Sequence, residues 1–238
     1  MDPTIRQWWR EERGRRGFLS TARRFAAALW EFLRESTPAS RRQRYGDTEF
    51  DWDYRVDTTS ATVSWRDRLL GELHSPYQPT DPALFHEMMA SVVSASGDGL
   101  SEFTFIDLGS GKGRALLMAA DYPFRRIVGV ELLPALYRIA RENIRGYASA
   151  SQKCIAIECI CGDAGDFVFP PEPIVLYLFN PMAEIRMRRV IANLERSLRQ
   201  KPRQVSVVYH NPEHEPVFGG FRRVVGTHRF SLSCCDGR

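Results

Sequence analysis

Residues that could bind a ligand stand at the ends of short apolar segments. Asp107 ends "FTFIDL" and is followed by the glycine-rich "GSGKG", and Glu131 ends "RIVGVE". Asp163 follows "CIAIECICG", and Asn180 with Pro181 closes "PIVLYLF". Carboxylate and amide groups accept hydrogen bonds, and carboxylates also attract cations. These positions are therefore the first candidates for a site of chemistry.

The elements that must position these residues alternate in type from residue 103 onward. The apolar runs named above and "QVSVVYHNP" predict strands, and helical patterns begin near Lys112, Pro134 and Glu184. Continuously apolar strands are typical of a parallel sheet covered on both faces. In such a sheet the strands end at one edge, where ligands bind near the topological switch point. The last segment, "EPVFGGFRRVVGTHRFSLSC", predicts an antiparallel edge. The fold class is therefore α/β, a Rossmann-like doubly wound and mostly parallel sheet.

The first hundred residues differ from this pattern. Residues 1–46 contain eleven arginines and five acidic residues, and an amphipathic helix is predicted there with an apolar face of Phe18, Ala22, Phe25, Leu29 and Phe32. We expect residues 1–46, a basic helical arm and linker, either to pack on the domain or to bind a nucleic acid or membrane surface. Residues 47–100 are a helical lead-in, with one helix near residues 65–73 and another at about 83–93. Residues 101–238 form the ligand-binding domain.

Composition limits the class of protein. The chain has 238 residues, a formal net charge of +4 and five cysteines. A chain of this length and apolar content does not need disulfides, so we expect a soluble protein of the reducing cytoplasm. Cys159 and Cys161 alternate along a predicted strand, and we expect both in the core. No histidine lies near them in the sequence, so we expect no metal site.

The glycine loop distinguishes between nucleotide ligands. A Walker phosphate loop needs Gly where Ile106 stands and Ser or Thr where Gly113 stands. A dinucleotide fingerprint has the spacing G-x-G-x-x-G, whereas this loop is G-x-G-x-G, and Asp107 would repel a pyrophosphate. A cofactor with a ribose, no phosphate and a cationic amino group suits Asp107 and Glu131. S-adenosylmethionine is such a molecule, and a dinucleotide-dependent oxidoreductase is the alternative.

Four motifs carry a family resemblance. In their order and spacing, "FIDLGSGKGR", "IVGVELLP", "CGDAGDF" and "LYLFNPM" resemble the successive motifs of class I S-adenosylmethionine-dependent methyltransferases. With "YQPT" ahead of them, they look most like the Dot1-like non-SET lysine methyltransferases. The stretch "YGDTEFDWDYRVDT" is similar to a family of bacterial methyltransferases without an assigned substrate.

The resemblance implies a role for each motif. The methionine end of the cofactor would be held by Tyr77, Thr80, Asp107, Gly109, Ser110, Gly111 and Gly113. Glu131 would bind the ribose, Asp163 and Ala164 would lie near the adenine, and Asn180 and Pro181 would line the methyl-transfer site. As alternatives to these binding roles, the residues of "GDAGD" are typical of a turn, and Asn-Pro can simply end a strand.

The expected function is methyl transfer from S-adenosylmethionine to a protein lysine amine or a small molecule. Amine-methylating relatives have an aromatic residue shortly after Asn-Pro, whereas this chain has Met182 and Ala183, so the acceptor stays open. Another alternative is a non-catalytic metabolite sensor whose basic arm binds nucleic acid or membrane.

Overall fold

The computed structural model describes residues 48–59, 79–97, 99–179, 184–212 and 219–235. The predicted arm at 1–46 and the helical pattern near 65–73 lie outside these residues. Residues Glu49–Thr58 and Pro79–Arg238 belong to one compact unit, and the fold described below is that of this unit.

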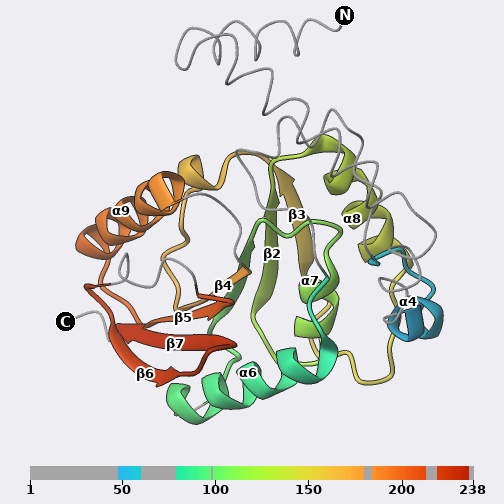
Figure 1. Ribbon diagram of the computed structural model, residues 1–238, viewed down its shortest axis with the longest axis horizontal. Coiled ribbons are helices and arrows are strands. Elements are labelled where there is room, and N and C mark those ends of the chain that lie inside the picture. Colours follow the sequence, from blue (N-terminus) through green and yellow to red (C-terminus); the bar gives the residue numbers. More distant parts are fainter. Residues whose placement is uncertain (1–47, 60–78, 98, 180–183, 213–218, 236–238) are drawn as a thin grey trace, which may run out of the picture. The chain divides into compact units, whose positions relative to one another are not determined.

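A seven-stranded sheet forms the centre of the unit (Figure 1). Its strands are β1 (Thr104–Leu108), β2 (Arg126–Glu131), β3 (Ile157–Cys161), β4 (Ile174–Phe179), β5 (Val205–His210), β6 (Arg222–Gly226) and β7 (Phe230–Cys235). The strand order is β3-β2-β1-β4-β5-β7-β6. The first five strands pair in parallel, and β7 runs antiparallel to both β5 and β6. The predicted fold class, with its antiparallel C-terminal edge, is confirmed.

The helices follow the strands in the alternation that the sequence predicts. They are α4 (Thr48–Tyr54), α6 (Pro82–Ser96), α7 (Arg114–Ala119), α8 (Pro134–Gly146), the 3-10 helix η2 (Ala164–Asp166) and α9 (Glu184–Gln200). A side-chain cap starts α6, because the Asp81 carboxylate accepts the Leu84 N–H at 2.8 Å and Pro82 occupies the first turn. Within the described parts of the chain, no helix is both long and apolar enough to cross a bilayer.

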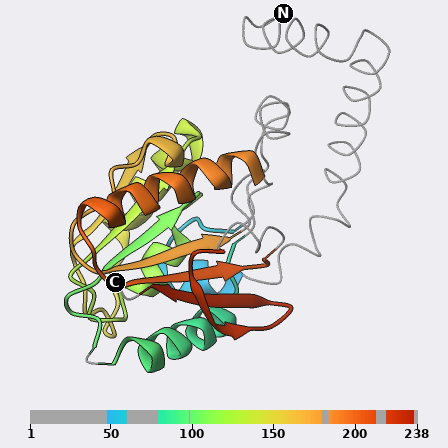
Figure 2. The same cartoon turned by 90° about the vertical axis from the view of Figure 1, so that its left-hand side faces the viewer.

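Apolar side chains pack on both faces of the sheet. Phe105 of β1 joins the cluster that contains α6 and α7, whereas Ile106 and Leu108 join the cluster that contains α9. Figure 2 shows α6 and α9 on opposite sides of the sheet. Because neighbouring residues of a strand point to opposite faces, Asp107 shares the face of Phe105.

One prediction about the core is wrong. Cys161 is exposed and Cys159 is only half-buried, because β3 is an edge strand with partly exposed side chains along its length. Alternating cysteines in an apolar run are typical of a central strand as well as of an edge strand, and strand order decides between the two. All five cysteines are free thiols.

Candidate functional site

The candidate site lies where β1 and its neighbours end. β1 pairs with β2 on one side and with β4 on the other, so the chain reverses its direction of winding at β1. Loops that leave two parallel strands on either side of such a point diverge and leave room for a ligand. The sequence candidates Asp107, Glu131 and the glycine loop all stand at this edge.

Left-handed backbone shapes the loop after β1. Gly109, Gly111 and Gly113 have φ angles of 86°, 55° and 86°, a region that strains residues with a side chain. The N–H groups of Gly109 and Ser110 donate to the Val130 carbonyl oxygen at 2.8 and 3.1 Å. The loop is therefore folded back onto the end of β2.

The Glu131 carboxylate braces the same loop. One oxygen, Oε2, accepts the Gly111 N–H at 2.8 Å, and the other, Oε1, accepts the Leu133 N–H at 2.7 Å. The residue is 6% exposed. Burial raises the pKa of this carboxyl, and the backbone N–H groups oppose the rise. Each oxygen has a further lone pair that can accept a hydrogen bond from a ligand hydroxyl.

Asp107 is the unusual group of the site. It is 3% exposed, and its carboxylate has no hydrogen bond or ion pair with any described residue. Burial raises its pKa well above the ordinary value, and the charge of Glu131 raises the pKa further. A buried carboxylate is costly to ionise, and a cationic group brought to it would relieve that cost. The Asp107 carboxyl therefore favours a positively charged group beside it.

Asp163 lies at the end of β3 and caps η2. Its Oδ1 accepts the Gly165 N–H at 2.8 Å, and its Oδ2 lies 3.8 Å from Nη1 of Arg189. Ala164, the first residue of η2, is buried. The turn role that the sequence suggested for "GDAGD" is thus present in the structure, and the adenine role stays a prediction.

A second group of polar residues links the segment before α6 to β4 and β5. The Thr80 hydroxyl oxygen lies 2.9 Å from the Tyr177 hydroxyl oxygen, which lies 3.1 Å from Nδ1 of His210. Tyr177 is the register partner of Asp107 across β1 and β4. Thr80 is therefore buried beside the candidate site, whereas Tyr77, Asn180 and Pro181 lie outside the described residues.

Residues 49–58 contact the glycine loop and the helix after it, a feature that sequence reasoning missed. The Nε–H of Arg114 donates to the Thr58 hydroxyl at 2.6 Å, and its Nη2 lies 3.2 Å from Asp51. The guanidinium also lies 4.9 Å from the centre of the Phe50 ring. Arg114 is buried, and the Asp51 carboxylate of α4 helps to compensate its charge.

Lys112, inside the glycine loop, makes a parallel connection. Its buried ammonium forms an ion pair with Asp57. The Asn143 side chain of α8 donates to the carbonyl oxygens of Asp57 and Lys112 at 2.8 and 2.9 Å and accepts the Asp57 N–H at 2.8 Å. The aspartates in "FDWDYRVDT" could have indicated these contacts, but their partners are distant in the sequence.

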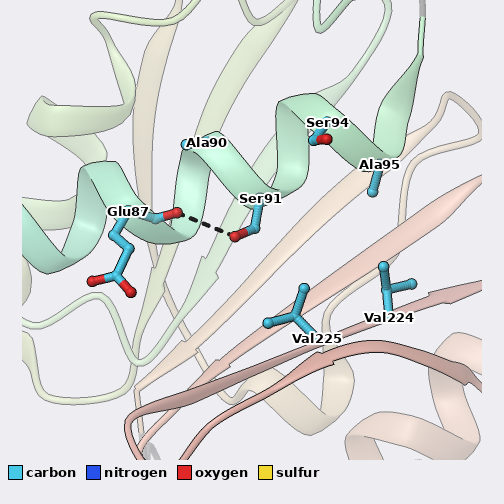
Figure 3. Close-up of a pocket in the computed structure, with 7 residues that line it drawn as sticks. All are labelled: Glu87, Ala90, Ser91, Ser94, Ala95, Val224 and Val225. Carbon is cyan, nitrogen blue, oxygen red and sulfur yellow. Dashed lines mark hydrogen bonds between the residues drawn. The ribbon is translucent and has the colours of Figure 1, made fainter.

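A separate pocket lies between α6 and β6. Figure 3 shows its lining, which consists of Glu87, Ala90, Ser91, Ser94, Ala95, Val224 and Val225. None of the candidate cofactor residues belongs to it. In the described ranges, no group of three or more His, Cys, Asp or Glu residues is arranged to hold a metal ion.

The sheet has β7 inserted antiparallel between β5 and β6. No protein-family model matches the chain, and no curated protein matches it. Similar solved structures include a ribosomal protein L11 methylase from Lactobacillus delbrueckii subsp. bulgaricus, at 16% identity and a TM-score of 0.46, covering 69% of this chain and 82% of that one.

Two others were solved with a cofactor-type ligand. An RNA methyltransferase from Salinibacter ruber in complex with S-adenosyl-L-homocysteine is 19% identical, with a TM-score of 0.41 and coverage of 66% of this chain and 91% of that one. A mutant of MtNAS in complex with S-adenosylmethionine is 17% identical, with a TM-score of 0.46 and coverage of 72% and 66%. Similarity at this level concerns the fold.

Proposed function

We propose that the protein is an S-adenosylmethionine-dependent methyltransferase. The observation that carries the proposal is Asp107, a buried carboxylate without a described partner beside a preformed glycine loop. The amino-acid end of S-adenosylmethionine has the ammonium group that such a carboxylate attracts. A dinucleotide would instead bring a pyrophosphate to a site that already contains the buried carboxylates of Asp107 and Glu131.

The other residues of the site fit the rest of the cofactor. The braced carboxylate of Glu131 has lone pairs available for two ribose hydroxyls. Asp163 and Ala164, which follow the neighbouring strand β3, would lie near the adenine. The cofactor would then extend over β1, β2 and β3, and its methionine end would lie toward β4.

Bound S-adenosylmethionine supplies a methyl group on a positively charged sulfur, which is a good leaving group. The protein then has to hold the acceptor in line with that methyl, and orientation can supply roughly 7–11 kcal/mol of the barrier. Asn180 and Pro181, which follow β4 in the sequence, are our candidates for orienting the acceptor. Unchanged turnover in Asn180→Ala would remove Asn180 from this role.

Calorimetric titration tests the proposal. We expect micromolar binding of S-adenosylmethionine by the full chain and no binding of NADH. Glu131→Gln should weaken the affinity about tenfold, or about 1.4 kcal/mol, because it loses charge-assisted hydrogen bonds. Glu87→Gln, which makes the same change in an exposed residue of α6, is the matched control and should bind as the wild type does. NADH binding, or no heat with S-adenosylmethionine in a folded protein, would contradict the proposal.

A further inference from the structure

The proposed cofactor leaves free one half of the sheet edge at which the parallel strands end. The glycine loop and Glu131 occupy the ends of β1 and β2, whereas β4 and β5 end on the other side of β1. Phe179 and His210 are the last residues of these two strands and are register partners. Their rings stack with centroids 3.8 Å apart and planes 19° apart. The two rings thus stand together at the ends of β4 and β5.

Among the residues that the structure describes, only one ring nitrogen of His210 has a hydrogen-bond partner. Nδ1 is 3.1 Å from the Tyr177 hydroxyl, and Nε2 has no hydrogen-bond partner among the described residues. The residue is only 9% exposed. The described residues thus leave Nε2 available for a hydrogen bond with a ligand or water at the ends of β4 and β5.

We propose that Nε2 of His210 contacts the methyl acceptor, with Thr80 and Tyr177 as positioning residues that fix the tautomer of the ring. This inference rests on the proposed function. In the required arrangement, His210 Nδ1–H donates to the Tyr177 oxygen and the Tyr177 O–H donates to Thr80. Each of the two hydrogen bonds then has one donor and one acceptor, and the Nε2 lone pair faces the methyl acceptor.

A neutral ring suits this position. Burial, followed by the charge of nearby Arg229, lowers the pKa of His210 to about 4, and the charge of Asp81 opposes this change. The ring is therefore uncharged at neutral pH and does not repel a positive sulfonium. The acceptor would carry its hydrogen on a reacting nitrogen or oxygen, which donates to Nε2 and is held in line with the methyl.

The acceptor's lone pair forms the bond to the methyl carbon, and the carbon–sulfur bond breaks with its electron pair on sulfur. The proton of the acceptor passes to Nε2 and then to water, because a group with a pKa of about 4 does not retain it.

Two ligands test the contact of His210 Nε2 without knowledge of the methyl acceptor. One is S-adenosylhomocysteine, which has no methyl group. The other is the S-adenosylmethionine analogue that has a primary amine at the methyl position. His210→Phe keeps a ring for stacking and should weaken the amine analogue about tenfold while S-adenosylhomocysteine stays within about twofold. Should that variant not fold, His210→Gln keeps a hydrogen-bonding group and should weaken the analogue less.

The control is His86→Phe. His86 also bonds a tyrosine hydroxyl, that of Tyr122 at 2.8 Å, but it is exposed and is not at a strand end. Its variant should leave both affinities unchanged. Equal changes for the two ligands in the His210 variants, or no change, would overturn the inference while leaving the proposed function intact. If the wild type binds neither ligand, the proposed function fails and this inference fails with it.

Nitrogen NMR of the histidine rings tests the positioning residues. We expect His210 to show the tautomer protonated at Nδ1 between pH 6 and pH 8, values chosen well above its pKa. Tyr177→Phe should shift the ring toward the tautomer protonated at Nε2, an effect that loss of packing alone does not produce. A wild-type ring already protonated at Nε2 would refute the proposed direction of the chain.

Discussion

Replacing Asp107 by asparagine should strengthen the fold and weaken cofactor binding at the same time. Asp107 is 3% exposed, and burial followed by the Glu131 charge raises its pKa well above the ordinary value. The folded state therefore favours the protonated form. Above the folded pKa, the ionised carboxylate costs stability that a neutral side chain of the same shape does not cost.

The sign and size of this change in stability follow from the linkage between protonation of the carboxyl and folding. Below the unfolded pKa, about 4, the carboxyl is protonated in both states and aspartate and asparagine should be similar. As the pH rises toward the folded pKa, Asp107→Asn gains about 1.4 kcal/mol for every pH unit that separates the folded from the unfolded pKa. Each kcal/mol corresponds to about 2–4 °C in Tm for a chain of this size. The gain should be fully present only at pH values above the folded pKa of Asp107.

Binding should change in the opposite direction. Loss of a charge-assisted contact to the cofactor's ammonium costs about 1.5–3 kcal/mol, which is about 10- to 150-fold in Kd. Thermal unfolding of the free protein and calorimetric titration with S-adenosylmethionine measure the two effects on one sample. A variant that is less stable than the wild type at pH 8, or that binds S-adenosylmethionine equally well, would refute the reasoning.

Three further predictions concern the same loop. The Kd for S-adenosylmethionine should rise as the pH falls through the raised pKa of Asp107, by at most about tenfold per pH unit, because a single proton competes with the ammonium. Calorimetry at several pH values measures this slope, and a pH-independent Kd would contradict the prediction. In Gly129→Ala the new Cβ would lie 2.8 Å from Oγ of Ser110. We therefore expect a loss of about 1–3 kcal/mol in stability and weaker cofactor binding, measured by denaturant unfolding and by titration. An unchanged unfolding midpoint would show that the loop adjusts freely. Asp57→Asn leaves the buried ammonium of Lys112 without its ion-pair partner, so cofactor affinity should fall severalfold, and equal affinities in titrations of both proteins would show that this pair does not position the loop.

The strands and helices of the sheet could be predicted because each is specified locally. β2 follows the predicted "RIVGVE" residue for residue, and α8 begins at the proline that the pattern indicated. Buried parallel strands are apolar throughout, and helices are marked by caps and prolines, so short windows of sequence contain the signal. The exposure of Cys161 could not be predicted in this way, because it depends on β3 being at the edge.

The candidate cofactor site was partly predictable for the same reason. Asp107, Glu131 and the glycines stand at strand ends, and parallel strands bring their ends to one edge whatever the strand order. Their roles toward a ligand stay predictions. The sequence did not indicate that Asp107 would be buried without a described partner, since burial depends on what packs around it.

The alternation of elements, the left-handed glycine turn and the carboxylates that follow the strands are all encoded locally, because each of them depends on neighbours in the chain. Which distant side chains meet is a different matter and depends on the folded whole. Thr80 lies 97 positions from Tyr177, and Asp57 lies 55 positions from Lys112. Strand order and register set such contacts, and both result from packing of the whole sheet rather than from any local pattern.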